Sequence, residues 1–378
     1  MNEVQRTAVE SLRKFLDAEL EPEFLSHRED EVVPKEKVKD WIKRMIPFGL
    51  VVAPHPVEEG GIGLDWSTHL RLWEEVVHSS ITLAGPLLLN TLVVELLVKY
   101  GSRELINRYV PGILTGDIIA SMGVSEPDVG SDVAAAKCRA VRDGDHWVIN
   151  GEKTWITNGS YSDFFICTCK TGDGELTHIL IDREEHGYEV RDIRKIAMNG
   201  QSTAQVFLNN VRVPVTNTVG KIGDGLRNTL IIFERARCHM ACWGYGIARR
   251  AKDEAVKYSQ QRIQHGKPIA GHQLIAEKIA TMATEIDAAR LLTLRAAEMI
   301  DRGQRCDTES SMAKWYGTEV GVRATRQALQ IHGGNGVTKE FIVERLLREA
   351  VIAPIPDGTT EIQKLIISRN LTGVQAFR

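Results

Sequence analysis

The sequence predicts an α+β protein, mainly helical, with a small central β-domain between two helical domains. Apolar residues recur at helical spacing up to about residue 115, alternate as in strands from about residue 118, and return to helical spacing after Gly225. A length of 378 residues suits two or three domains. We expect an N-terminal helical domain at residues 1–117, a β-domain at 118–222 and a C-terminal helical domain at 223–378.

The N-terminal domain is expected to contain several antiparallel helices. Two apolar stripes at helical spacing lie there, formed by Val9, Leu12, Phe15 and Leu16 and by Leu70, Trp73, Val76 and Val77. Pro22, Pro34, Pro47 and a loop at 54–63 interrupt the pattern. Connections between helices are expected at these interruptions.

The central domain is expected to be a small barrel-like or sandwich-like sheet. Asp143-Gly144 separates two runs of alternating polarity, and this dipeptide is typical of the turn in a β-hairpin. The expected strands are 137–142, 146–150, 164–170, 178–181, 188–193 and 204–208. Short strands joined by tight turns do not fit βαβ units.

The C-terminal domain is expected to be a four-helix bundle. Long helices are predicted to begin near Asn228, Ile275 and Glu309. In the second of them, Ile279 and Met282 continue the apolar stripe of a bundle helix.

Composition and charge exclude several classes of protein. A net charge of -3 offers no basic surface for nucleic acid. The N-terminus lacks the apolar core of a secretory signal and the Arg-rich character of a transit peptide. The most apolar stretch, 87–98, is interrupted by Asn90 and Glu95, so we expect no membrane span and a cytoplasmic protein.

The six cysteines are expected to be reduced core residues. Only Cys167 and Cys169 have the spacing of a ligand pair, and no second pair is present to complete a zinc site. We therefore predict that the protein has no metal site.

Four motifs have both a structural and a functional interpretation. The loop at 124–132 fits an Asp-capped turn, and it also fits a loop that directs backbone N–H groups at a phosphate or a heteroaromatic edge. Trp155 and Thr157 are predicted to share one face of a strand, as an outer hairpin pair or as a wall for a planar ligand. No G-x-G-x-x-G follows a strand, so a Rossmann site is excluded.

The other two motifs lie in the C-terminal domain. Gln330-Ile331-His332-Gly333-Gly334-Asn335-Gly336 has more glycines than a helix C-cap needs, which fits either close packing or an approaching phosphate. In the segment 356–363, Asp357 or Thr359 fits a helix N-cap, and Asp357 also fits a general base held on a loop.

Taken together, these motifs resemble those of the acyl-CoA dehydrogenase family over nearly the whole chain. The matching pieces are V-S-E-P-x-x-G-S-D, I-N-G-x-K-x-W-I-T-N-G, V-x-V-P, Q-x-x-G-G-N-G and D-G-T-x-E-I-Q. The resemblance implies an FAD flavoprotein, usually a homotetramer built as a dimer of dimers. It also implies an electron-transferring flavoprotein as the acceptor.

The resemblance implies which residues would contact the FAD. Met122, Val124 and Ser125 would line the isoalloxazine, with Ser125 in place of the family's usual Thr; Trp155 would cover one face and Thr157 would hydrogen-bond near N5. Ser131 would lie by the pyrophosphate or the thioester, and Thr359 and Glu361 would approach the FAD from the last loop. The residues expected to hold the ADP half across a subunit interface are Arg262, His265, Gln330, Gly333 and Gly334. His265 stands where the family has an apolar aromatic residue.

The resemblance also implies the substrate-binding residues Arg237, Trp243 and Gly358 and the catalytic base. Arg237 matches a CoA-contacting arginine, and Trp243 falls where relatives often have Gly or Ser in the acyl tunnel. Most members carry the base as Glu in Tyr-Glu-Gly-Thr, whereas this chain has Asp357, whose carboxylate is set back by about 1–1.5 Å. Residues 238–249 contain no acid, so Asp357 is the base or there is no dedicated base.

The function expected from the resemblance is FAD-dependent α,β-dehydrogenation of an acyl-CoA. A carboxylate removes the α-proton and hydride passes from Cβ to flavin N5. Trp243 fits a side chain that packs against a neighbouring helix or one that fills the acyl tunnel. In the second case, the filled tunnel and the shorter base predict a compact acyl group, which is short, branched or cyclic. Two alternatives stay open, namely a related flavoprotein that eliminates or oxidises another carbon acid and a non-catalytic flavin-bearing scaffold.

Overall fold

The structure is a computed structural model that describes residues 3–376. The chain forms two compact units, each assembled from separate stretches of sequence. One, the helical unit, contains residues up to 21, 66–81 and 234 onward. The other, the sheet unit, contains residues 22–65 and 82–233.

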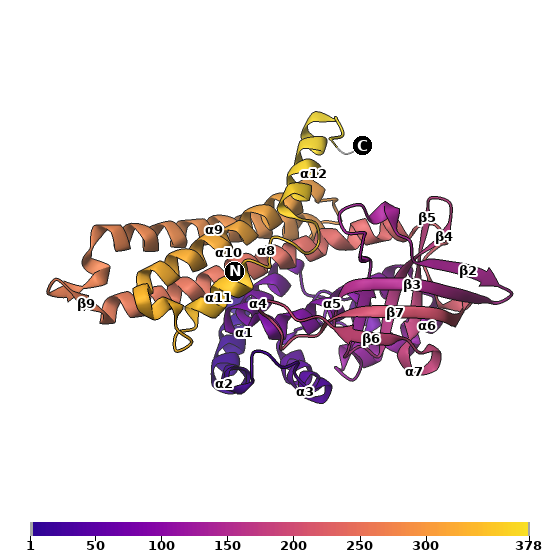
Figure 1. Cartoon of the computed structure of the whole chain (residues 1–378), viewed down its shortest axis with the longest axis horizontal. Coiled ribbons are helices and arrows are strands. Elements are labelled where there is room, and N and C mark those ends of the chain that lie inside the picture. Colours follow the sequence, from indigo (N-terminus) through magenta and orange to yellow (C-terminus); the bar gives the residue numbers. More distant parts are fainter. Residues whose placement is uncertain (1–2, 377–378) are drawn as a thin grey trace. The chain divides into compact units, whose positions relative to one another are not determined.

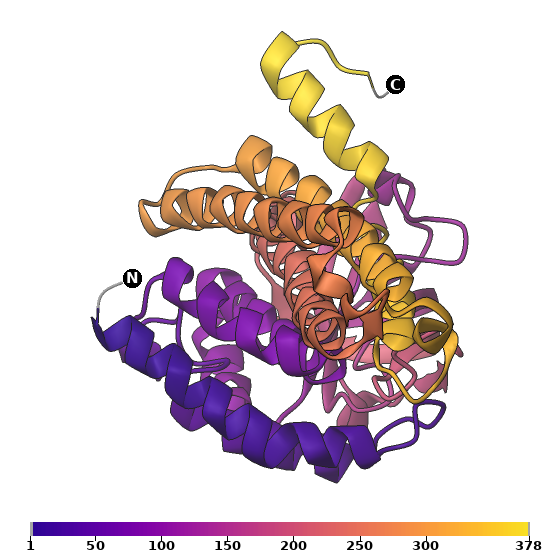
Figure 2. The ribbon, with the colours of Figure 1, turned by 90° about the vertical axis from the view of Figure 1, so that its left-hand side faces the viewer.

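The helical unit is built around three long helices that lie side by side (Figure 1). Its elements are α1 (Glu3–Phe15), α4 (Trp66–Ser79), most of α8 (Gly225–Gln261), β9 (Ile263–Gln264), β10 (Lys267–Pro268), α9 (Gln273–Asp301), α10 (Asp307–His332), α11 (Val343–Ala350) and α12 (Thr360–Thr372). Figure 2 shows α12, in yellow, projecting from the other helices of this unit.

Glycines allow α8 and α10 to approach closely. A Cβ on Gly244 of α8 would lie 2.2 Å from the carbonyl oxygen of Gly317 in α10. A Cβ on Gly317 would in turn lie 2.9 Å from the carbonyl oxygen of Ala241. Backbone therefore packs against backbone, which fixes how the middle of α8 faces α10.

The sheet unit combines helices with one mixed sheet of eight strands. The helices are α2 (Glu21–Ser26), α3 (Lys35–Met45), α5 (Ile81–Tyr100), α6 (Arg103–Leu114) and α7 (Arg183–His186). The strands are β1 (Ala120–Gly123), β2 (Arg139–Asp143), β3 (His146–Thr157), β4 (Phe164–Gly172), β5 (Glu175–Asp182), β6 (Glu189–Asp192), β7 (Thr203–Pro214) and β8 (Thr218–Val219). Their order is β6-β7-β3-β2-β4-β5-β8, with β1 parallel to β4.

The sheet encloses an apolar core formed by alternate residues of its strands. Trp147, Ile149, Phe165, Ile179 and Val206 are among its buried members. In β7, buried residues alternate with more exposed ones over Thr203–Leu208, as the period of two predicts, whereas the first six residues of β4 are all buried.

The predicted fold class, an α+β protein with a central sheet and a C-terminal helical region, is confirmed. The bounds of the three predicted domains remain predictions. The expectation that no apolar stretch has the length of a membrane span was wrong for α5. This helix of 20 residues is long and apolar enough, but 83% of its most apolar window is buried inside the protein, as in a core helix.

Candidate active site

Asp357 lies in the loop between α11 and α12 in a strained backbone conformation. Its φ is 55°, in the left-handed region, and Gly358 follows with a φ of 89°. Such a conformation costs a non-glycine residue on the order of 1 kcal/mol or more and persists only where its surroundings enforce it. The φ of Gly358 favours glycine, and a Cβ there would also lie 2.7 Å from Gln363 Nε2, so that the glutamine side chain would have to shift.

The loop is held by two buried side chains. Lys314 Nζ, from α10, donates to the carbonyl oxygens of Pro354 at 2.6 Å and Gly358 at 2.7 Å. Gln363 Nε2, from α12, donates to the carbonyl oxygens of Asp357 at 3.1 Å and Gly358 at 2.8 Å. The backbone on both sides of Asp357 is therefore fixed by hydrogen bonds.

Burial and the nearby positive charges act in opposite directions on the pKa of the Asp357 carboxyl group. Burial raises the pKa of Asp357, while Lys314 and Arg237 lower it. The side chain is half-buried. A carboxylate in such surroundings is a candidate general base, since its basicity is raised while nearby cations still stabilise its charge.

Arg237 of α8 lies in the same unit and is 3% exposed. Its Nη1 lies 3.5 Å from Asp307 Oδ1, and its Nε has no hydrogen-bond partner among the described residues. Burial lowers the pKa of Arg237. A buried guanidinium with an unused donor is equipped to bind an anionic or carbonyl oxygen of a ligand.

Trp243 lies one and a half turns further along α8 and is 8% exposed. Its indole Nε1 has no hydrogen-bond partner among the described residues. Its position in an acyl tunnel stays a prediction.

In the sheet unit, the structure brings two of the predicted motifs together. Lys153 Nζ donates to the carbonyl oxygen of Val124 at 3.1 Å, and Thr154 N donates to that of Ser125 at 3.0 Å. Met122 precedes them in β1 and is half-buried. The loop after β1 is thus attached to β3 just before Trp155.

Trp155 occupies an irregularity of β3. The pairing with β7 shifts between Lys153 and Ile156, and Trp155 has a φ of 62°. The indole is 60% exposed, and Thr157 beyond the buried Ile156 is half-buried. Bulges of this kind redirect side chains next to functional sites. Ser131 is exposed on the preceding loop.

The glycine-rich segment after α10 contains two kinds of glycine. A Cβ on Gly336 would lie 2.4 Å from the carbonyl oxygen of Leu329, so packing requires this glycine. Gly333 and Gly334 have no atom within 4 Å of such a Cβ, and Gly333 has a φ of 59°. Packing therefore does not explain Gly334, and Gln330 beside them is exposed.

The remaining predicted cofactor residues are dispersed over the helical unit. Arg262 and His265 are exposed at the β9–β10 hairpin, where His265 has a φ of 50° in the turn. Thr359 is the N-cap of α12, because its Oγ1 accepts from Ile362 N at 3.4 Å, and Glu361 is exposed. Among the described residues, no hydrogen bond or ion pair joins the β9–β10 hairpin to the Asp357 loop.

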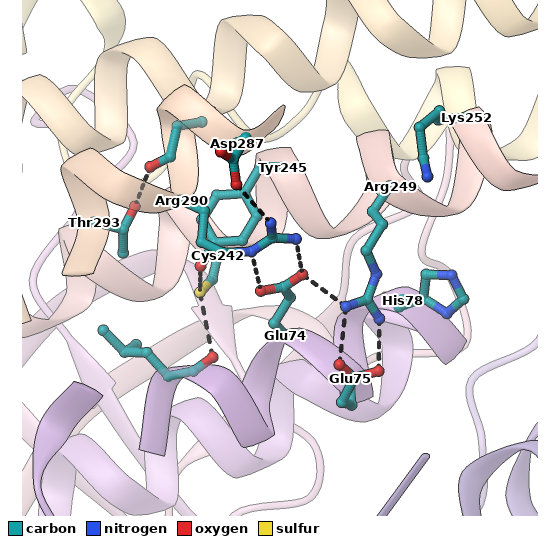
Figure 3. A network of polar contacts seen from close by, with 12 residues as sticks. Glu74, Glu75, His78, Cys242, Tyr245, Arg249, Lys252, Asp287, Arg290 and Thr293 are labelled. Atoms are coloured by element: carbon teal, nitrogen blue, oxygen red, sulfur yellow. Dashed lines mark hydrogen bonds and ion pairs between the residues drawn. The ribbon is translucent and has the colours of Figure 1, made fainter. Parts of the chain in front are cut away.

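Sequence analysis missed a buried ionic network between α4, α8 and α9 (Figure 3). Glu74 accepts from Arg249 at 2.7 Å and from Arg290 at 2.7 and 3.0 Å. Glu75 accepts from Arg249 at 2.6 and 2.8 Å and from Arg13 at 2.8 Å. The sequence signal for this network is the pair of adjacent acids, Glu74 and Glu75, within an otherwise apolar helical stripe.

Sequence analysis also missed a histidine pair next to Arg237. His69 Nε2 and His239 Nε2 are 2.8 Å apart, and both side chains are fully buried. His239 Nδ1 lies 2.9 Å from the carbonyl oxygen of Arg235, which requires the Nδ1–H tautomer. His239 Nε2 therefore accepts a hydrogen bond from His69, and burial lowers the pKa of His239 to about 4.

The cysteine prediction rested on an incomplete set of thiols. Cys138 joins Cys167 and Cys169, with all three sulfur atoms within 4.8 Å of one another and buried. They qualify as a metal-ligand cluster by distance. The buried ammonium of Lys153 lies close enough to interact electrostatically with all three, which opposes the binding of a cation. The absence of a metal site remains a prediction.

Comparison with known proteins identifies the family. Three family models match the chain, described as the acyl-CoA dehydrogenase N-terminal domain (residues 2–117), middle domain (121–211) and C-terminal domain (223–372).

Relatives that match most of this chain support the same family. An acyl-CoA dehydrogenase of Bacillus subtilis is 35% identical, covering 88% of this chain and 89% of its own length. Cyclohexane-1-carbonyl-CoA dehydrogenase of Syntrophus aciditrophicus is 33% identical, covering 98% and 97%. The caffeyl-CoA reductase-Etf complex subunit CarC of Acetobacterium woodii is 33% identical, covering 94% and 95%.

Solved structures are similar to this chain over nearly their whole length. A glutaryl-coenzyme A dehydrogenase in complex with glutaryl-CoA is 31% identical with a TM-score of 0.94, covering 99% of this chain and 96% of that one. A glutaryl-CoA dehydrogenase of Mycobacterium smegmatis in complex with FADH2 is 26% identical with a TM-score of 0.93, covering 100% and 97%. The chain therefore belongs to the acyl-CoA dehydrogenase family and is an oxidoreductase of acyl-CoA thioesters.

Proposed function

We propose that this enzyme catalyses the FAD-dependent α,β-dehydrogenation of an acyl-CoA, with Asp357 as the base that removes the α-proton. The observation that carries the proposal is the placement of Asp357. It is an ionisable group on a loop that is rigidly held and strained, with the cations Arg237 and Lys314 in its field. Such a group is what proton abstraction from a carbon acid requires.

The residues present fit an FAD. Trp155 presents an exposed indole at a strand irregularity, and Gly333 and Gly334 leave open space beside backbone that a phosphate can approach. The sheet-unit residues proposed to contact the flavin are Met122, Val124, Ser125, Trp155 and Thr157. The chemistry that FAD supplies when bound is acceptance of a hydride from Cβ of the acyl group.

The protein's own groups would perform the proton transfer and bind the substrate. Asp357 would accept the proton, and its burial makes it a stronger base than an exposed aspartate. The unused donor of Arg237 would bind an oxygen of the CoA thioester. Since Asp357 is one methylene shorter than the usual glutamate, the α-carbon would have to lie closer to the loop.

A compact acyl group fits these features best. Trp243 would fill space that a long alkyl chain needs. The relatives named for cyclohexane-1-carbonyl-CoA and the neighbour bound to glutaryl-CoA act on or bind compact acyl groups, which supports this choice.

We also propose an electron-transferring flavoprotein as acceptor and a homotetramer as the assembly. The relative described as part of an Etf complex supports the first. Large apolar side chains exposed on the helical unit, which a second copy would cover, support the second. They include Leu274, Leu291, Leu371 and Val374, which are 61–77% exposed.

The test is anaerobic reduction of the purified flavoprotein by butyryl-, isobutyryl-, cyclohexanecarboxyl-, octanoyl- and palmitoyl-CoA. Bleaching of the flavin absorbance by at least one thioester is expected. Asp357→Asn should still bind FAD and ligand but reduce at least ~10²-fold more slowly, the usual scale for a general base. A protein that takes up no FAD, or an Asn variant with near-native rates, would contradict the proposal.

A further inference from the structure

We propose that Lys314 is a positioning residue for the reaction, one that holds the loop of Asp357 in its productive conformation and keeps the carboxylate ionised. The inference rests on the proposed function, since it assigns Lys314 a role in the action of Asp357. No motif pointed to Lys314, which lies in the first half of α10 and is 0% exposed.

The first argument is the placement of its hydrogen bonds. Lys314 Nζ binds the carbonyl oxygens of Pro354 and Gly358, three residues before and one residue after Asp357. One ammonium thus clamps both sides of the residue whose backbone is in the left-handed region. Neutral side chains offer fewer donors from one atom, whereas an ammonium has three.

The second argument is that the loop needs such a clamp. Two consecutive residues, Asp357 and Gly358, have positive φ, which an isolated loop would not maintain. Gln363 holds the loop from α12, and Thr360 Oγ1 donates to Glu319 of α10 at 2.8 Å. Only Lys314, among these, connects α10 to the loop residues on both sides of Asp357.

The third argument is electrostatic. Burial lowers the pKa of Lys314 to about 8, against the attraction of Asp357, Glu319 and Glu361, and Arg237 lowers it further. Lys314 therefore carries its charge at neutral pH. Its charge favours the ionised carboxylate of Asp357, which is the form that accepts a proton.

The Lys314→Met variant of the full-length flavoprotein removes both the hydrogen bonds to the loop and the positive charge. The measurement is the rate of flavin reduction as a function of pH. The expected results are a loss of about 10²-fold in the rate of flavin reduction at pH 7 and a shift of the rising limb of the pH–rate profile to higher pH. FAD content should be unchanged. Lys314→Arg keeps the charge, so its rising limb should stay in place although its rate falls.

Hydrogen exchange gives a readout that does not depend on turnover. In Lys314→Met, amides of residues 355–360 should exchange at least ~10-fold faster, because the loop loses the bonds that close it. Lys364→Met is the matched control. Lys364 is an exposed lysine of α12 whose Nζ lies 5.0 Å from the centroid of the Trp315 ring, and among the described residues it makes no hydrogen bond to the loop.

The outcomes separate this proposal from the proposed function. If no thioester reduces the wild-type flavin, the proposed function fails while the exchange experiment still reports on the clamp. Two results in Lys314→Met would overturn the role of Lys314. One is an unchanged rate of amide hydrogen exchange at residues 355–360. The other is a loss of less than about 3-fold in the rate of flavin reduction, with the rising limb of the pH–rate profile at its wild-type position. If Lys314→Met does not fold, Lys314→Gln, which is neutral but keeps a donor, is read by the same criteria.

Discussion

Lys153 Nζ lies 2.8 Å from Glu126 Oε1 within the sheet unit, and the two side chains are 0% and 5% exposed. The carboxylate also accepts from the backbone amides of Lys137 at 2.7 Å and Cys138 at 3.0 Å. The pair therefore joins the loop after β1 to β3 and to the start of β2. This arrangement carries the loop that we propose to face the flavin.

Breaking this pair should be costly. Lys153→Met leaves an uncompensated buried carboxylate, so we expect a loss of about 3–5 kcal/mol in the free energy of unfolding. Urea unfolding followed by circular dichroism measures it. The double variant Lys153→Met/Glu126→Leu should lose clearly less than the sum of the single variants. Additive losses would show that the two groups do not stabilise each other.

The pH dependence of stability should report on Glu75. Burial opposes ionisation, but hydrogen bonds from Arg249 and Arg13 outweigh it and lower the pKa of Glu75 to about 2. Since the pKa in the unfolded chain is higher, the stabilisation is complete above about pH 4.5 and is lost as the pH falls toward 2. It amounts to about 3 kcal/mol.

Glu75→Gln isolates this contribution. The difference in unfolding free energy between wild type and variant should be largest near pH 6 and shrink steadily below pH 4.5. Urea unfolding at a series of pH values measures it. A difference that is constant from pH 6 to 3 would contradict the lowered pKa.

Gly244→Ala should strongly destabilise the helical unit. The new methyl group would lie 2.2 Å from the carbonyl oxygen of Gly317, and backbone cannot move aside as a flexible side chain can. We expect a loss of about 3 kcal/mol or more, at the upper end for overpacking. Gly271→Ala is the control, because its nearest contact would be Lys267 Cδ at 3.4 Å. Equal melting temperatures for the two variants would argue against a close α8–α10 contact.

The fold class could be predicted because long periodic stripes determine it. Leu70 and Trp73 are buried where the helical period places them, and Ile149 and Val206 where the strand period does. Periodicity carries no information on side chains that meet from distant segments. Cys138 reaches Cys167 across the sheet, and the sequence alone gave no sign of it.

In the candidate site too, residues of local motifs could be predicted from the sequence, and contacts between distant segments could not. Asp357 and Trp155 could be found because each belongs to a local motif, although the positive φ of each was not predicted. Lys314 could not be found, because its partners are backbone carbonyl groups 40 and 44 residues away. Backbone acceptors have no sequence signature, so such a clamp is visible only once the chain is folded.

The acyl preference should depend on Trp243. We expect wild-type flavin to be reduced faster by butyryl-, isobutyryl- or cyclohexanecarboxyl-CoA than by octanoyl- or palmitoyl-CoA, because a buried indole occupies the volume that a long chain needs. Trp243→Gly should shift the preference toward octanoyl-CoA by about 10-fold or more in kcat/KM, on the scale of a few buried methylenes.

Leu230→Ala is the control, since this apolar side chain of α8 is 42% exposed, whereas Trp243 is 8% exposed. Its acyl preference should equal that of wild type. Two results would assign Trp243 to packing between helices instead. One is a wild-type preference for octanoyl- or palmitoyl-CoA over every compact thioester. The other is a Trp243→Gly variant that loses stability but keeps the wild-type order of substrates.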